Sequence, residues 1–86
     1  MTLNYRVLLK KIYKTMDNND TEVLSFEQVF KLGENIGLDR GDVGQILFCL
    51  MYNQHIRRVG RNYFSLTDEG IREVLKALSQ VYIQEE

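Results

Sequence analysis

Residues 53–70 read NQHIRRVGRNYFSLTDEG, and this segment decides the expected fold. Within it, 55–59 and 63–66 each predict a short strand. The three residues between them, 60–62, include glycine and asparagine, which tolerate the positive φ angles of a tight turn. Thr67 then caps a helix, with acidic residues in the first turn where the helix dipole favours them. The segment therefore predicts a β-hairpin followed directly by a helix.

Two further helices are expected before the hairpin, joined by only three residues. The first is predicted over 26–36, where Ser25 and the glutamine three residues later form a capping box and Gly37 suits a left-handed helix end. The second is predicted over 40–53, with Asp39 as its cap. A helix, a short turn that contains glycine and a second helix form the helix-turn-helix pattern. On the second helix, the side expected to be buried carries Val43, Ile46, Leu47, Leu50 and Met51.

The remaining segments complete the expected fold. A first helix is predicted over 4–16, a short strand over 21–24, and a last helix up to a frayed tail at 84–86. Gly33, on an apolar helix face, indicates close packing against another backbone. The whole chain, 1–86, is expected to be one domain, mainly α-helical with a small β-hairpin (α+β), in the order helix, strand, helix, helix, strand, strand, helix. The apolar face of the first helix carries Tyr5, Leu8, Leu9, Ile12, Tyr13 and Met16, and that of the last helix carries Ile71, Val74, Leu75, Leu78, Val81 and Tyr82.

Length and composition limit the function. The 86 residues make one domain, which is too short for a doubly wound sheet with a full cofactor site or for a TIM barrel. With 44% hydrophobic and 27% charged residues, the chain is typical of a soluble globular domain, and its net charge of -1 does not itself indicate a nucleic-acid partner. There is no apolar run of about 18 residues and no secretory signal, so we expect a cytoplasmic protein without a membrane segment.

Neither a catalytic nor a metal site is expected, and no cofactor is implied. The only cysteine, Cys49, cannot form an internal disulfide or a structural zinc site by itself, and it fits a reducing compartment. The only histidine, His55, has no serine or acid at a usable spacing and is expected to be structural. Residues 17–20, DNND, lack the ligand spacing of a calcium loop. The chain is therefore not expected to be an enzyme.

Charge is distributed unevenly along the chain, although the total is nearly neutral. Residues 1–16 hold four cations and no anion, and residues 55–66 hold three cations and no acid. The first group is interpreted either as a solvated helix face or as an edge that faces phosphates or an acidic partner. The second group either protects an edge hairpin from aggregation or lies along phosphates or in a minor groove. The candidate phosphate contacts of the first group are Lys10, Lys11 and Lys14, beside Arg6, and those of the second are Arg57, Arg58 and Arg61.

The outward side of helix 40–53 changes character along its length. Arg40 and Gln45, in its first half, suit guanine and adenine edges respectively, although helices that read DNA normally carry more cations than this one. Phe48 and Tyr52, in its second half, are large aromatic side chains. These two residues pack in the core, form a subunit or partner contact, or touch DNA, and the sequence leaves the three alternatives open.

The order of elements and segment 53–70 resemble a winged-helix domain, the helix-turn-helix variant with a β-hairpin, of the kind seen in small MarR-type and PadR-type prokaryotic regulators. In that pattern an aromatic residue, a polar residue, Leu-Thr, two acidic or polar residues and a glycine close the wing, and residues 64–70 fit it. The resemblance covers about residues 3–83. It implies a recognition helix at 40–53 and a wing at 57–63. The base-facing candidates that it implies are Arg40, Gly41, Asp42 and Gln45, and the groove or phosphate contacts are Arg58, Arg61 and Asn62.

Two functions are expected on these grounds. The first is a small winged-helix DNA-binding protein, a homodimeric transcriptional regulator, with helix 40–53 in the major groove and the wing on phosphates or in the minor groove. The alternative is a protein-interaction module of the same fold without DNA binding, for which Phe48 and Tyr52 are the contact candidates. DNA binding is favoured if the two cationic groups flank helix 40–53 on one side, and protein binding is favoured if they lie on opposite sides.

Overall fold

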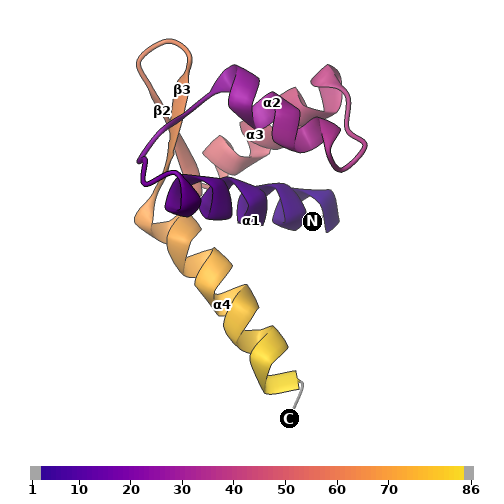
Figure 1. Ribbon diagram of the computed structural model, residues 1–86, viewed down its shortest axis with the longest axis vertical. Coiled ribbons are helices and arrows are strands. Elements are labelled where there is room, and N and C mark those ends of the chain that lie inside the picture. Colours follow the sequence, from indigo (N-terminus) through magenta and orange to yellow (C-terminus); the bar gives the residue numbers. More distant parts are fainter. Residues whose placement is uncertain (1–2, 85–86) are drawn as a thin grey trace.

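The computed structural model describes residues 3–84, and Figure 1 shows its helices and strands in the predicted order. The mixed α+β class is confirmed. Of the tail predicted at 84–86, Gln84 still belongs to the last helix, and the other two residues lie outside the described part, as do the side chains of Val81 and Tyr82. The elements are α1 (Leu3–Asn18), β1 (Leu24–Ser25), α2 (Phe26–Glu34), α3 (Arg40–Tyr52), β2 (Ile56–Val59), β3 (Tyr63–Leu66) and α4 (Asp68–Gln84).

α1 buries the face that its apolar spacing predicted, with Tyr13 half-buried at the margin. The helix ends two residues later than predicted, and Asp20 in the following turn adopts a φ of 50°, which short polar residues tolerate. Its apolar face joins side chains from α2, α3 and the sheet in one core. Side chains that are fully buried in this core include Leu8, Ile12, Leu24, Val29, Val43 and Leu50.

Capping boxes hold the N-termini of α2 and α3. The Ser25 hydroxyl accepts a hydrogen bond from the N–H of Gln28 at 3.2 Å, and the N–H of Ser25 donates to the Gln28 side chain at 2.8 Å. Asp39 and Asp42 exchange the same two bonds at the start of α3. Each box satisfies two backbone donors that a helix end would otherwise leave unpaired, so the local sequence sets where both helices begin.

The turn between α2 and α3 depends on two glycines. Gly37 has a φ of 83°, the left-handed conformation predicted for it. However, α2 ends at Glu34 with Asn35 as its C-cap, two residues earlier than predicted, so Gly37 lies in the turn and does not end the helix. A Cβ atom at Gly33 would lie 2.3 Å from the Val43 Cγ2 atom. The close approach at Gly33 is therefore real, but it is made to a side chain of α3 and not to another backbone.

The strands form an antiparallel sheet in the order β1-β3-β2. The predicted hairpin is confirmed: Arg57 pairs with Ser65 and Arg58 pairs with Phe64. Gly60 has a φ of 66° in the turn. Because side chains alternate across a strand, Arg57 and Ser65 lie on one face of the sheet and Arg58 and Phe64 lie on the other.

β1 differs from the predicted strand at 21–24. The Thr21 hydroxyl donates to the carbonyl oxygen of Val23 at 3.1 Å and accepts from its N–H at 3.4 Å. These local bonds occupy the backbone groups that a ladder needs, so pairing begins only at Leu24, which lies opposite Phe64.

α4 begins against the hairpin and then leaves the body of the molecule (Figure 1). The Thr67 hydroxyl accepts from the N–H of Gly70 at 3.0 Å, which confirms the predicted cap. Val74 is buried, whereas Leu75, on the predicted apolar face, is 48% exposed. Only a narrow face of α4, which includes Gly70 and Val74, therefore packs against the rest of the protein. Leu75 lies at the margin of that face.

Candidate nucleic-acid interface

The turn of the hairpin, residues 58–62, is contiguous with the starts of α2 and α3 along one edge of the molecule. We call it the wing turn, after the wing that the resemblance implies at 57–63. The N–H of Phe26 donates to the carbonyl oxygen of Asn62 at 2.9 Å, which joins the turn to α2. The Arg40 guanidinium lies 3.4 Å from the Glu27 carboxylate, which joins α2 to α3. These two contacts bring Asn62 and Arg40 to the same edge, although they are distant in sequence.

The wing turn carries two exposed arginines that differ in their roles. Arg58 donates hydrogen bonds from Nε, at 3.0 Å, and from Nη2 to the carbonyl oxygen of Arg61. Arg58 therefore closes the turn with its guanidinium, which still adds positive charge at the tip. Arg61 is exposed, and Asn62 beside it is exposed as well. Because Arg58 and Arg61 are both exposed at this turn, its tip carries two positive charges.

Arg40 is exposed but engaged within the chain. Its guanidinium carbon lies 4.2 Å from the centre of the Phe30 ring, and one nitrogen reaches Glu27. The side chains of Arg40 and Glu27 are 71% and 68% exposed, so water surrounds this ion pair. In this arrangement a carboxylate already neutralises the single cation of α3.

The outward side of α3 is polar in its first half and apolar in its second. Gln45 is exposed, whereas the Asp39 and Asp42 carboxylates accept backbone N–H bonds within the capping box. Phe48 is 66% exposed and Tyr52 is 80% exposed. The alternative in which these two aromatic residues pack in the core is therefore wrong. We call this exposed pair, Phe48 and Tyr52, the aromatic ridge.

Arg57 lies apart from the other arginines of the hairpin. It lines a groove of about 420 Å³ between the sheet, the end of α1 and the start of α4. The groove disfavours phosphate, because more acidic side chains than cations line it. The carboxylates that line the groove belong to Asp17, Asp20, Glu22 and Asp68.

The cations of α1 lie on another side of the molecule. Lys10 and Lys14 are exposed, and Lys11 is half-buried. α1 contacts α3, and the apolar faces of both helices enter the same core. The α1 lysines therefore lie on the face of α1 turned away from the core that it shares with α3, and not beside the outward side of α3.

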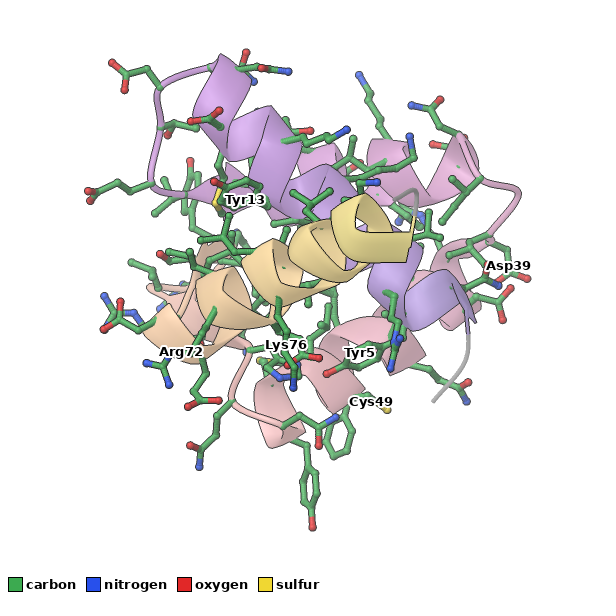
Figure 2. The ribbon with its side chains drawn as sticks, turned by 90° about the horizontal axis from the view of Figure 1, so that it is seen from below. Tyr5, Tyr13, Asp39, Cys49, Arg72 and Lys76 are labelled. Carbon is green, nitrogen blue, oxygen red and sulfur yellow. The ribbon has the colours of Figure 1, made fainter. Side chains whose placement is uncertain are left out.

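A polar network joins α1 to the start of the hairpin, and its Tyr5 and His55 side chains are buried. The Tyr5 hydroxyl lies 2.7 Å from Nδ1 of His55, and Nδ2 of Asn53 donates to the same hydroxyl at 3.0 Å. His55 is therefore buried and hydrogen-bonded to Tyr5. In Figure 2, Tyr5 lies on the side of α4 nearer α3, and Tyr13 lies on the other side. Sequence reasoning assigned Tyr5 to the apolar face alone and missed this network.

Burial raises the pKa of the Tyr5 phenol above its ordinary value of 10.0. The hydrogen bond from Asn53 acts in the opposite direction, and the nearby Cys49 and Glu73 raise the pKa further. Figure 2 shows Cys49 close to Tyr5 at the edge of α3. The phenol therefore remains a neutral hydrogen-bonding group at neutral pH.

Comparisons with protein-family models, curated proteins and solved structures each found nothing similar. Within residues 3–84, no cluster of metal-ligating side chains is found, and none of the described helices is long and apolar enough to cross a membrane.

Proposed function

We propose that the chain is a winged-helix protein that binds double-stranded DNA with its wing turn and the first half of α3. One observation carries the proposal. The Asn62–Phe26 and Glu27–Arg40 contacts gather the wing turn and the starts of both helices of the helix-turn-helix along one edge. In winged-helix proteins these parts meet the duplex, with a helix in the major groove and the wing beside it.

In this proposal the wing supplies the affinity and α3 supplies the contact with bases. Arg61 and Arg58 neutralise phosphates and release counterions, and Gln45 faces the base edges. Few cations lie on this edge, so the dependence on salt is shallow. We expect log K to fall with log salt at a slope of about -2, which corresponds to two phosphates. Sequence-specific regulation of transcription by a homodimer is the biological role that fits such a module.

Replacement of Arg61 by alanine tests this proposal. Arg61→Ala should make the salt slope shallower by about 1, because one phosphate contact is lost. Fluorescence anisotropy of a labelled duplex, titrated between about 50 and 200 mM salt, measures the slope. Arg72→Ala is the matched control, because Arg72 is an exposed arginine on α4 that pairs with Glu69. Arg72→Ala removes one positive charge at a position away from the wing turn, and it should leave the salt slope unchanged.

Two results would contradict DNA binding. The first is the absence of binding at low salt to both genomic fragments and random duplex. The second is an equal loss of affinity in Arg61→Ala and Arg72→Ala, which would indicate attraction by overall charge without contact at the wing. The lysines of α1 offer a further comparison, since Lys10→Ala should resemble Arg72→Ala if α1 faces away from the duplex.

The aromatic ridge favours a second candidate, a protein-interaction module. Phe48 and Tyr52 expose large apolar surfaces on one helix face, and aromatic residues are enriched in protein interfaces. The α1 lysines, on a different side from this face, also support this candidate. A partner on the ridge would cover the outward side of α3, so it would compete with the duplex. A second copy of the chain is the first partner to test, and a dimer formed through the ridge would be an alternative to DNA binding.

Sedimentation velocity tests this second candidate. The Phe48→Ala/Tyr52→Ala double variant should be monomeric under conditions in which the wild type forms dimers. A Tyr63→Ala/Leu75→Ala double variant also removes two exposed hydrophobic side chains, but from the wing and α4, and it should still form dimers. A wild type that remains monomeric at all concentrations, or dimers that survive in the ridge variant, would exclude the ridge as a self-association surface.

A further inference from the structure

Arg40 makes two contacts that decide how it can act at the proposed DNA edge. Its guanidinium lies over the ring of Phe30, at 4.2 Å from the ring centre, and reaches the Glu27 carboxylate at 3.4 Å. Phe30 is buried and Glu27 belongs to the first turn of α2. The first residue of α3 therefore contacts two residues of α2 on this edge, although the side chains of Arg40 and Glu27 are mostly exposed.

The two contacts have opposite consequences for a phosphate. The Phe30 ring restricts the guanidinium without neutralising it, because the attraction to a ring face leaves the positive charge in place. Glu27 neutralises it and occupies a donor that would otherwise bind an oxygen of the DNA backbone. The Asp39 and Asp42 carboxylates are also near the start of α3, but both accept N–H bonds in the capping box. Glu27 is the acid whose partner is Arg40 itself.

We propose that Glu27 is an internal competitor for phosphate that keeps Arg40 out of the DNA contact and lowers the affinity of the protein for DNA. This inference rests on the proposed DNA-binding function. Removal of the Glu27 charge leaves Arg40 on the Phe30 ring at the edge, where its free donors meet the backbone of the duplex. The strength of DNA binding is then limited by an acid on α2 and not only by the number of cations on the wing.

Glu27→Gln tests this inference, with Glu34→Gln as the matched control. Both substitutions remove one negative charge from an exposed position of α2, but Glu34 lies at the opposite end of the helix. In Glu27→Gln the slope of log K against log salt should steepen by about 0.9, the value for one additional phosphate. A fourfold increase in salt then weakens this variant about 3.5-fold more than the wild type. Glu34→Gln should keep the wild-type slope.

Arg40→Ala in both backgrounds completes the experiment. In the wild type it should leave the salt slope unchanged, because Arg40 does not contact phosphate there. In Glu27→Gln it should abolish the gain. A loss of about one unit of slope for Arg40→Ala in the wild type would overturn the inference, and so would equal slopes for Glu27→Gln and Glu34→Gln. Either of these two contrary results would overturn the inference while the wild type still binds DNA. If neither the wild type nor Glu27→Gln binds any duplex, the proposed function is overturned as well.

Discussion

Gly70→Ala should destabilise the protein by about 3 kcal/mol, because the added methyl group has no space. A Cβ atom at this position would lie 2.0 Å from the carbonyl oxygen of His55 and 2.9 Å from its carbonyl carbon. Both are backbone atoms at the start of the hairpin, so no side chain can rotate to relieve the overlap. α4 must shift away from the sheet, and the burial of Val74 is weakened with it.

Urea unfolding followed by circular dichroism measures this effect, with Gly44→Ala as the control. Gly44 is a helical glycine in α3 with no atom within 4 Å of the position of a Cβ. Alanine is favoured over glycine inside a helix, so Gly44→Ala should stabilise the protein by about 0.5–1 kcal/mol. Equal stabilities for the Gly70 and Gly44 variants would show that the close contact between α4 and the His55 peptide group does not exist.

Leu50→Ala should also cost about 3 kcal/mol of stability, in this case by creation of a cavity. Leu50 is fully buried on the inner side of α3, in the core that also contains Leu8 and Ile12. Truncation removes apolar contacts with α1 and leaves a space that the surrounding helices fill only in part. The free energy of unfolding from urea titration is again the quantity to compare.

Phe48→Ala is the control on the same helix. Phe48 is mostly exposed, so its truncation should change stability by less than about 0.5 kcal/mol, as is usual for surface positions. A large loss for Phe48→Ala together with a small loss for Leu50→Ala would mean that α3 is rotated relative to the core. The expected result has a practical use, because any effect of Phe48→Ala on association then reflects the interface and not unfolding.

Elements that depend on local chemistry could be predicted from the sequence. The two capping boxes at Ser25 and Asp39 and the glycines at 37 and 60 are each set by residues a few positions apart. The hairpin and the cap at Thr67 are local in the same sense. These signals were sufficient to give the class and the order of elements.

Features that depend on tertiary contacts were predicted less well. The pairing of Leu24 with Phe64 joins residues far apart in the chain, so propensity alone placed the first strand too early. The exposure of Leu75 follows from how little of α4 the body covers, which a helical pattern does not reveal. The hydrogen bond between Tyr5 and His55 spans 50 positions and gives no sequence signal.

In the candidate interface, too, local features could be predicted and tertiary contacts could not. The arginines at 57, 58 and 61 are neighbours in sequence, but alternation across the strand separates Arg57 from Arg58 and places Arg57 among carboxylates. The pairing of Arg40 with Glu27 crosses the turn between two helices, so helical spacing could not predict it. Charge counted along a segment therefore indicates a positive surface only after the fold decides which side chains share a face.

The junction between the hairpin and α4 has a mechanical consequence. The N–H of Thr67 donates to the carbonyl oxygen of His55 at 3.1 Å, its hydroxyl donates to that of Gln54, and Gly70 packs on the same peptide group. Backbone groups and the Thr67 hydroxyl make this joint, so we expect the first turn of α4 and the start of the hairpin to move together.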